Sequence, residues 1–351
     1  MLKIYIGQLI PGKSYLPILF PLLGAISRPH WLFVDFVNAF PKQLFVIVED
    51  PAQADYLLIP HDFFAISSNT TYIEGFESLS TTHHIPIIIF DYSDFDTPIT
   101  VSNSIVFRMA TYRSKLAPNE IIMPAAVEFP DPATISFRPK QQVPVVGFCG
   151  FAGFRTWKDR VKYYYKCITI TAMAAAGLIS RAYLPGIYFR RKSLNILRRD
   201  TSVSTSFIVR SSYSGHADTI EVGPQQARTE YIENIVGSDF VLAPKGDGNY
   251  SRRFYEILSH GRIPVLVDTE CVLPFESEIA YEDFIIRIPY FDLASLSRVI
   301  AQKYNSVSDQ AYIEMQRRAL EVFNTKLRAD VFFTRMFTEP GYLDRYNPWK
   351  K

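Results

Sequence analysis

Short, continuous apolar runs divide the first part of the chain into strand-sized pieces. Five such runs span residues 2–6, 44–48, 56–59, 85–90 and 104–108. Runs of this length without polar alternation are typical of strands that are buried on both faces of a parallel sheet. The stretch at 70–80 between two of them predicts a helix. This part of the chain therefore predicts βαβ units, whose functional loops lie at the carboxyl ends of the strands.

A proline-bearing break separates these runs from a second α/β series. Residues 128–142 hold three prolines and no apolar period, which indicates a linker. Beyond it, strands are predicted at 143–148, 206–210, 239–243 and 263–267, and helices at 158–179, 230–236, 251–260, 293–304 and 309–323. A chain of 351 residues is long for one domain. We therefore expect two Rossmann-like α/β domains, at 1–135 and 136–325, with a tail at 326–351 that could cross back to the first.

Composition narrows the function classes. The hydrophobic fraction of 48% argues against disorder, and a net charge of +2 without a basic stripe argues against nucleic-acid binding. Cys149, Cys167 and Cys271 form no C-x-x-C pair, so neither a zinc site nor a disulfide framework is indicated. Prolines interrupt the apolar N-terminal stretch, which predicts neither a signal sequence nor a membrane span. A soluble, cytoplasmic protein is the expectation.

The most informative segment is 241–267, which predicts a strand, a glycine-bearing loop, a helix and a strand in that order. Gly246 and Gly248 lie where the first strand ends, and Asn249 or Ser251 can cap the helix. The helix start leaves backbone N–H groups unpaired, and these groups with the helix dipole form an anion site. Gly261 fits the stop of the helix.

Positive charges at this helix start strengthen the anion interpretation. Arg252 and Arg253 lie in the first turn, and Lys245 lies just upstream. Cations there are unfavourable by roughly 0.3–1 kcal/mol each, a cost that a bound diphosphate would reverse. The alternative is an ordinary surface pair between Arg252 and Glu256, four residues apart. The segment has neither the G-K-[ST] of a P-loop nor G-x-G-x-x-G.

The string at 238–275, SDFVLAPKGDGNYSRRFYEILSHGRIPVLVDTECVLPF, resembles the signature of the exostosin family, glycosyltransferase family 47. Pro-x-Gly, Ser-x-Arg, an aromatic-x-Glu pair, Gly-x-Ile-Pro-Val and Leu-Pro-Phe are all present. The resemblance implies two domains facing across a cleft (GT-B), a nucleoside-diphosphate sugar donor, most often UDP-linked, and inversion at the anomeric carbon. Arg262 replaces a cysteine that is common in the family, a change expected to matter little. The membrane anchor of many members is not expected here.

Site roles follow from the same resemblance. Ser251 and Arg253 would hold the diphosphate, with Lys245, Gly246 and Gly248 in the same loop. Glu256 would bind ribose or sugar hydroxyls, and Arg155, in a second similar stretch, would approach the phosphates. Arg210 ends a predicted strand, where contact with the donor and a structural ion pair are equally compatible with the sequence.

An inverting transferase also needs a base that deprotonates the acceptor hydroxyl. Carboxylates at strand ends of the first domain are the candidates: Asp62, Asp91 and Asp94, with His61 weaker. Asp94 and Asp96 also form a D-x-D triplet, the metal motif of the other large transferase fold. The alternative for these aspartates is capping of turns and helices.

The sequence therefore predicts an inverting glycosyltransferase with a UDP-linked donor, a glycan, glycolipid or glycoprotein acceptor, and no metal or other cofactor. Direct displacement would be stabilised by the helix end and the arginines. A lipid-linked acceptor would bring the enzyme to a membrane surface. The competing hypotheses are a non-catalytic carbohydrate-binding or scaffold protein of the same fold, and a metal-dependent transferase that uses Asp94 and Asp96.

Overall fold

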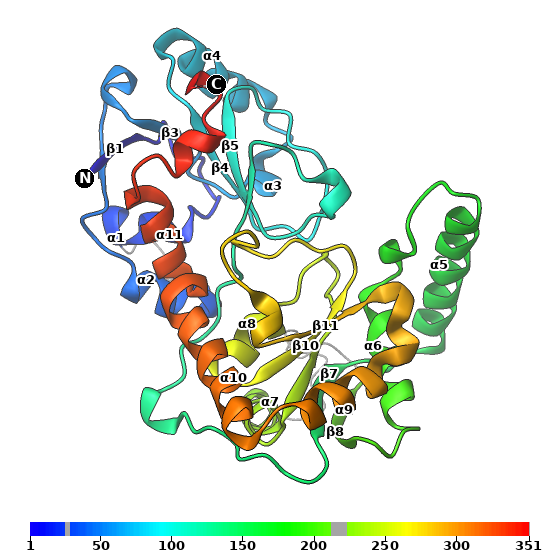
Figure 1. Cartoon of the computed structure of the whole chain (residues 1–351). Helices are drawn as coiled ribbons and strands as arrows, with labels where there is room; N and C mark the ends of the chain where they lie inside the picture. Colours follow the sequence, from blue (N-terminus) through cyan, green and yellow to red (C-terminus); the bar gives the residue numbers. More distant parts are fainter. Residues whose placement is uncertain (25–28, 212–222, 351) are drawn as a thin grey trace. The chain divides into compact units, whose positions relative to one another are not determined.

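Two parallel sheets, one in each of two units, form the framework of the chain (Figure 1). The computed structural model describes residues 1–24, 29–211 and 223–350. Unit 1 consists of Met1–Phe129, Val272–Glu276 and Asn324–Lys351, and unit 2 consists of Pro130–Cys271 and Ser277–Phe323. The predicted α/β class with two parallel sheets is confirmed.

The sheet of unit 1 has six parallel strands in the order β2-β1-β3-β4-β5-β6. Its strands are β1 (Leu2–Tyr5), β2 (Phe45–Ile47), β3 (Tyr56–Leu58), β4 (Ile87–Asp91), β5 (Ser104–Arg108) and β6 (Glu120–Ile122). All residues of β4 and β5 are buried, as their continuous apolar runs predicted. The sequence did not predict β6, whose first residue is a glutamate.

Helices of unit 1 are short except for α4. They are α1 (Phe20–Leu23), α2 (Val34–Ala39), α3 (Phe63–Ile66), α4 (Thr70–His83) and α11 (Ala329–Thr338). Asn69 caps α4 by accepting a hydrogen bond from the backbone N–H of Tyr72. Ile73 and Phe76 of α4 belong to one core cluster with Leu57, Ile87 and other strand residues.

The chain returns to unit 1 after α10, and α11 places aromatic rings against the sheet. Phe333 contacts the rings of Phe36, Phe90 and Phe107 at centroid distances of 5.8, 5.3 and 5.6 Å. Phe337, one turn later, meets Phe107 at 5.7 Å. The last helix of the chain thus completes the core of its first sheet.

The sheet of unit 2 has five parallel strands in the order β11-β10-β9-β7-β8. Its strands are β7 (Val145–Phe151), β8 (Ser204–Arg210), β9 (Phe240–Ala243), β10 (Ile263–Asp268) and β11 (Ile286–Pro289), and its helices are α5 (Trp157–Ala175), α6 (Gly186–Leu197), α7 (Pro224–Val236), α8 (Arg252–Ser259), α9 (Leu296–Ser306) and α10 (Asp309–Val322). Residues of α6 and α9 share a core with alternate residues of β7, β9 and β10, and α8 packs on the other face of the sheet (Figure 1). The sequence did not predict α6 or β11.

The helix α8 has the amphipathic face and the stop that its sequence predicts. Phe254, Ile257 and Leu258 are buried. Gly261 has a φ of +62° and donates its N–H to the carbonyl of Leu258, while Arg262 donates to that of Ile257. This pair of bonds is a Schellman motif, which only a residue tolerant of positive φ completes cheaply.

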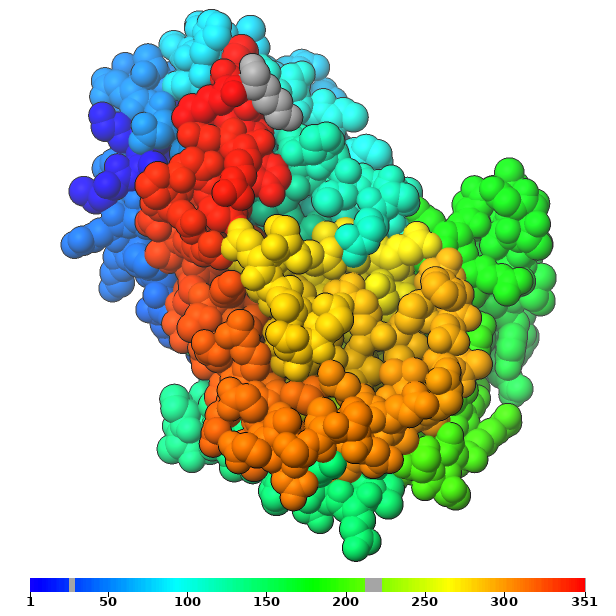
Figure 2. Space-filling view, in the orientation of Figure 1, coloured from blue at the N-terminus to red at the C-terminus, as the bar shows by residue number. Residues whose placement is uncertain are grey.

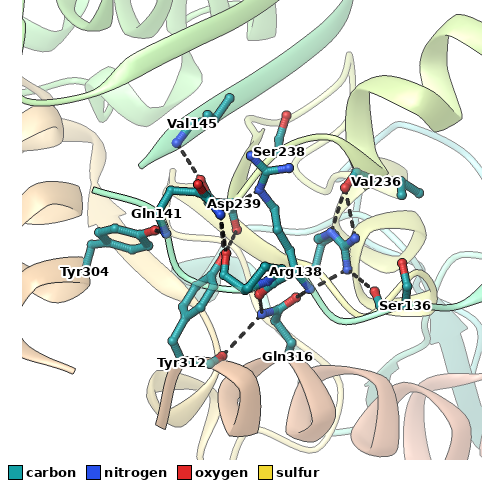
Figure 3. A network of polar contacts seen from close by, with 12 residues as sticks. Ser136, Arg138, Gln141, Val145, Val236, Ser238, Asp239, Tyr304, Tyr312 and Gln316 are labelled. Carbon is teal, nitrogen blue, oxygen red and sulfur yellow. Dashed lines mark hydrogen bonds and ion pairs between the residues drawn. The ribbon is translucent and has the colours of Figure 1, made fainter. Parts of the chain in front are cut away.

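A buried polar network joins the strand starts of unit 2 to the linker at 136–141 (Figure 3). The carboxylate of Asp239 accepts bonds from Arg138 Nε at 2.8 Å, the Tyr312 hydroxyl at 2.9 Å and the backbone N–H of Val145 at 2.7 Å. Burial and the Asp239 charge raise the pKa of Tyr312. Three donors from separate segments compensate for burying this charge.

The expectation that Arg262 matters little is wrong. Its side chain is 2% exposed and donates to the carbonyls of Val236 and Ser136 at 2.9–3.1 and 2.7 Å. It also donates to the amide oxygen of Gln316 at 3.3 Å. A cysteine could make none of these bonds, so this position ties α7, the linker and α10 together through one guanidinium.

We predict that Phe333→Ala lowers the free energy of unfolding by about 3–5 kcal/mol, because it removes a buried ring and leaves a cavity among three others. Urea unfolding followed by circular dichroism measures the change. The control Phe291→Ala removes a ring that is 78% exposed and should cost less than about 0.5 kcal/mol. Equal effects of the two substitutions would contradict the proposed packing of α11.

Candidate functional site

The loop between β9 and α8 is ordered by its own hydrogen bonds. Gly246 donates its N–H to the carbonyl of Tyr250 at 2.9 Å, and Ser251 occupies the N-cap position without a side-chain capping bond. Asn249, the other predicted cap, instead exchanges two bonds with Thr269 beyond β10, at 2.6 and 3.1 Å. The Ser251 hydroxyl and the first N–H groups of α8 are therefore not engaged in a cap at this helix end.

Arg253 extends from the first turn of α8 to the carboxyl end of β7. Its Nη2 donates to the carbonyl of Cys149 at 2.7 Å, and its guanidinium lies 4.5 Å from the ring centre of Phe148. A Cβ at Gly150 would lie 2.5 Å from Nη2, so only glycine leaves room for this approach. Gly150 also has a φ of +152°. For Nη1 the structure shows no hydrogen bond to any residue it describes, which leaves an N–H pair for an anion.

Glu256 lies one turn further along α8 and is nearly buried. One carboxylate oxygen accepts from Arg228 at 3.1 Å and the other from the hydroxyl of Tyr231 at 2.5 Å, both on α7. Burial and the Glu256 charge raise the pKa of Tyr231. Glu256 thus pairs with Arg228 and not with Arg252, contrary to the surface-pair alternative. Each oxygen keeps a lone pair that could accept from a ligand hydroxyl.

Arg210 ends β8 next to the same point of the sheet. Its Nη2 bonds Glu230 of α7 at 2.6 Å, and its guanidinium contacts the thiol of Cys149. Burial raises the pKa of Cys149, an effect that the neighbouring Arg210 and Arg253 oppose. The structure therefore places two of the predicted donor-site arginines, Arg210 and Arg253, at Cys149. Of the two interpretations of Arg210, the structure shows the ion pair. The serine-rich loop predicted after Arg210 extends into residues 212–222, outside the described residues.

Lys245 points into the interior of unit 2. Its ammonium donates to the carbonyl of Ala182 at 2.6 Å and lies 5.5 Å from the ring centre of Phe189. A Cβ at Gly186, the first residue of α6, would lie 2.1 Å from the carbonyl oxygen of Gly246. The start of α6 therefore packs directly against the β9–α8 loop. Arg190 of α6 also donates to the carbonyl of Lys245 at 3.2 Å.

The remaining predicted donor residues differ in exposure. Gly248 is buried in the loop, and Arg155 is exposed just before the N-cap Thr156 of α5. The sequence analysis missed Gly150, Arg190, Arg228 and Tyr231. For Arg190 the sequence did offer one indication, namely the adjacent arginines Arg190 and Arg191. Two adjacent arginines are unusual on a helix that packs against a sheet.

A buried charged triad closes the carboxyl edge of the unit 1 sheet. Arg108, 1% exposed at the end of β5, pairs with Asp91 at 3.2 Å and with Glu120 at 2.6 Å. Its Nη2 also donates to the carbonyls of Phe95 and Thr97 at 3.1 and 3.2 Å. Asp91 is thus committed to holding the loop that follows β4, where it also accepts from the backbone of Ser93.

Asp62 has a different environment at the same edge. Its carboxylate accepts from the backbone N–H of Tyr92 at 2.8 Å, and no basic side chain pairs with it in the described part of the chain. Burial raises the pKa of Asp62 to about 6, and the nearby Asp91 charge adds to the rise. A carboxylate with a pKa of about 6 is suited to accept a proton near neutral pH.

The other unit 1 candidates are held by local contacts. Asp94 is exposed, while Asp96 pairs with Lys115 at 2.6 Å. His61 is buried and bonds the backbone with both ring nitrogens, to Ile10 N at 2.9 Å and Ser14 O at 2.9 Å, and burial lowers its pKa. His61 is therefore a neutral ring, and its two hydrogen bonds hold the loop after β1 in place. Among the described residues, no group of three or more His, Cys, Asp or Glu could hold a metal ion.

Comparison with known proteins identifies a family for part of the chain. Residues 187–303 match the family model described as the Exostosin GT47 domain. This segment belongs to the exostosin family. The exostosin segment holds α6, α7 and the β9–α8 loop, and therefore Lys245, Ser251, Arg253 and Glu256.

Two curated relatives support the match. A probable glycosyltransferase of Arabidopsis thaliana is 30% identical over 94 residues, which cover 27% of this chain and 17% of the relative. The Exostosin-1 homolog of Caenorhabditis elegans is 30% identical over 102 residues, covering 29% of this chain and 26% of the relative. The chain thus matches less than a third of the length of either relative.

A solved structure covers more of the chain at a greater distance. Anabaena Alr3699/HepE, determined in complex with UDP, matches 96% of this chain and 98% of its own with a TM-score of 0.43 and 10% identity. A TM-score below 0.5 is too low for this structure to bear on the chemistry. Separately, every helix in the described ranges is too short or too polar to cross a membrane.

We predict that Asp62→Asn alters how stability depends on pH. Because the pKa of Asp62 is raised from 3.8 to about 6 on folding, the folded state binds more protons, and the free energy of unfolding falls as pH rises from about 4 to 6. The full loss is on the order of 3 kcal/mol. Asparagine should remove it, so urea unfolding at pH 4 and pH 7.5 should show a gain only at pH 7.5. Parallel curves for the two proteins would contradict this assignment.

Proposed function

We propose that this chain is an inverting glycosyltransferase that moves a sugar from a nucleoside-diphosphate donor, UDP-linked, to a hydroxyl of a glycan acceptor. In this proposal unit 2 binds the donor and unit 1 binds the acceptor, as in a GT-B enzyme. Exostosin membership of 187–303 motivates the proposal, and the geometry at Arg253 carries it.

The Arg253 geometry is that of a preformed anion site. A guanidinium fixed by Cys149 O and stacked on Phe148 presents Nη1 next to the open start of α8. Such a cation is unfavourable at a helix N-terminus until an anion is present. A diphosphate there would receive N–H groups from the helix, the Ser251 hydroxyl and Arg253, with Arg155 reaching it from the loop before α5. Glu256 would accept from a ribose or sugar hydroxyl.

The proposed reaction is a single displacement. The acceptor hydroxyl gives its proton to Asp62 while its oxygen attacks the anomeric carbon of the donor. The bond from that carbon to the diphosphate breaks, and its electron pair stays on the phosphate oxygen. The helix end and arginines stabilise that developing charge, the work for which other transferases use a metal. A metal site at Asp94 and Asp96 is disfavoured because Lys115 already pairs with Asp96.

An exposed aromatic pair supports an acceptor role for unit 1. Phe64 of α3 and Phe95 stack with ring centres 4.8 Å apart and are 54% and 52% exposed. Phe64 is two residues from Asp62, and Phe95 lies on the loop that Arg108 holds. Exposed rings are suited to the apolar faces of sugar rings, so we propose that this pair contacts a glycan, glycolipid or glycoprotein acceptor. A cytoplasmic location, with a lipid-linked acceptor at the membrane, completes the proposal.

We predict that UDP binds the full chain and that Arg253→Ala weakens binding by about 1.5–3 kcal/mol, the range for a hydrogen bond to a charged group. Isothermal titration calorimetry measures the dissociation constant. Arg253→Lys should recover only part of the loss, because lysine cannot bond Cys149 O and a phosphate in the same fork. The control Arg318→Ala, a surface cation of α10, should leave binding unchanged.

Two outcomes would favour the competing hypotheses. UDP binding without transfer to any acceptor, across a panel of UDP-sugars, would favour the scaffold protein. Complete loss of transfer in chelator, with recovery on adding a divalent cation, would favour the metal-dependent enzyme. Binding of UDP that Arg253→Ala leaves unchanged would overturn the donor-site assignment itself.

We predict that Asp62→Asn lowers the turnover rate roughly 10²–10⁴-fold, the usual contribution of a general base, and leaves UDP affinity unchanged. In the wild type the rate should rise with pH through about 6 and then level. Phe64→Ala with Phe95→Ala should instead raise the KM for acceptor at a similar turnover rate. Steady-state kinetics with varied acceptor concentration separates these effects. A wild-type turnover rate for Asp62→Asn would show that another residue is the base.

A further inference from the structure

The helix α5 presents apolar side chains on its outer face. Trp157, Val161, Tyr165 and Ile168 are 72%, 57%, 72% and 69% exposed, and they recur at spacings of three and four residues. A surface helix normally turns such residues inward and polar residues outward. This helix stands out from the sheet of unit 2 and forms the green lobe of Figure 2.

The outer stripe is not the face that holds α5 to its unit. The inward face consists of other residues at the same helical spacing, namely Tyr163, Cys167, Ile170 and Ala174, all partly buried. Cys167 and Ile170 pack against the core of unit 2. The helix is therefore apolar on two opposite faces, and the outer one needs an apolar environment that the described residues do not supply.

Charge on α5 selects the kind of environment. The helix carries Lys158, Arg160, Lys162 and Lys166 against one carboxylate, Asp159. That carboxylate is engaged in the capping box with Thr156. The three lysines follow a helical row beside the apolar stripe, because they too are four residues apart. A helix with tryptophan and aliphatic residues on one face and lysines at its flank matches an interface between lipid acyl chains and anionic headgroups.

A cationic hollow lies beside α5, where Tyr163 and Tyr164 line it. It has a volume of about 350 Å³ between α5 and α6, and its lining includes Arg191, Lys192 and Arg199 of the α6 region with the rings of Tyr163 and Tyr188. Lys192 lies 5.6 Å from the ring centre of Tyr188. The hollow adds three cations to those that α5 carries, and its volume is large enough for a phosphate headgroup.

We propose that α5 and this hollow dock unit 2 onto an anionic membrane, with the Trp157 stripe entering the headgroup region and the lysines and the hollow binding lipid phosphates. A second copy of the chain would cover the apolar stripe equally well. It would bring together two rows of lysines, however, and like charges at an interface oppose association. An anionic lipid surface satisfies both the stripe and the charges.

Co-sedimentation of the full chain with vesicles tests the proposal. The protein should bind vesicles of phosphatidylcholine with phosphatidylglycerol and should bind pure phosphatidylcholine vesicles far less. The variant K158Q/K162Q/K166Q should lose on the order of 100-fold in partition coefficient, at about a factor of five for each lysine near the surface. The control K303Q/R317Q/R318Q removes the same charge from α9 and α10 and should bind as the wild type.

Fluorescence distinguishes insertion from simple electrostatic adsorption. Brominated phosphatidylglycerol should quench part of the tryptophan emission, and Trp157→Phe should abolish that quenching while the protein still sediments with vesicles. V161S/I168S should weaken binding, whereas F291S, which changes another exposed ring of unit 2, should not. Each of these substitutions is at an exposed site, so a thermal melt should show wild-type folding.

Three results would overturn the proposal. Equal binding of wild type and K158Q/K162Q/K166Q to anionic vesicles would remove the role of the lysines. Binding that soluble glycerol phosphate fully competes away at millimolar concentration would indicate a small-molecule site in the hollow. A dimer in sedimentation velocity that V161S/I168S dissociates, without vesicle binding, would assign the stripe to a second copy.

Discussion

The position of one guanidinium depends on the lack of a side chain at Gly150. Arg253 reaches the carboxyl end of β7 because nothing projects from residue 150, and it is kept there by the carbonyl of Cys149 and the ring of Phe148. The α7 residues Arg228 and Tyr231 hold Glu256. A Cβ at residue 150 would force the guanidinium to shift and would disturb its bond to the carbonyl of Cys149.

The two units hold buried charge in different ways, and this difference fits the roles proposed for them. In unit 1, Arg108 pairs with both Asp91 and Glu120 and holds the loop after β4. Asp62 lies outside this triad, and burial, with a smaller contribution from the nearby Asp91 charge, raises the pKa of Asp62 to about 6. In unit 2, cations are in excess around Cys149. A displacement with a phosphate leaving group requires an acid–base group and an anion site, the roles proposed for Asp62 of unit 1 and Arg253 of unit 2.

The sequence predicts most of the parallel strands because short continuous apolar runs are typical of strands that are buried on both faces of a sheet. It misses β6 and β11 because Glu120 and Arg287 interrupt short strands with charges whose partners, Arg108 and Asp268, lie on neighbouring strands. It misses α6 because that helix begins at Gly186 after Pro185, without a capping side chain that would mark its start. The exostosin signature predicts Arg253, but the contacts of Arg253 lie 104 residues away in sequence, at Cys149. Only the folded chain reveals which glycine the arginine needs.

The short segment Val272–Glu276 has a consequence for how this protein can be divided. It leaves the sheet of unit 2 after β10, places Phe275 against Phe332 and Tyr342, and pairs Glu276 with Arg113 before the chain returns. With the C-terminal helix, it makes unit 1 a domain of three separate stretches of sequence. A gene fragment that ends near residue 129 would encode the sheet without the rings that cover it. The two units are therefore not exchangeable modules, and a chimaera that replaces unit 2 would have to keep Val272–Glu276 and the C-terminal stretch with unit 1.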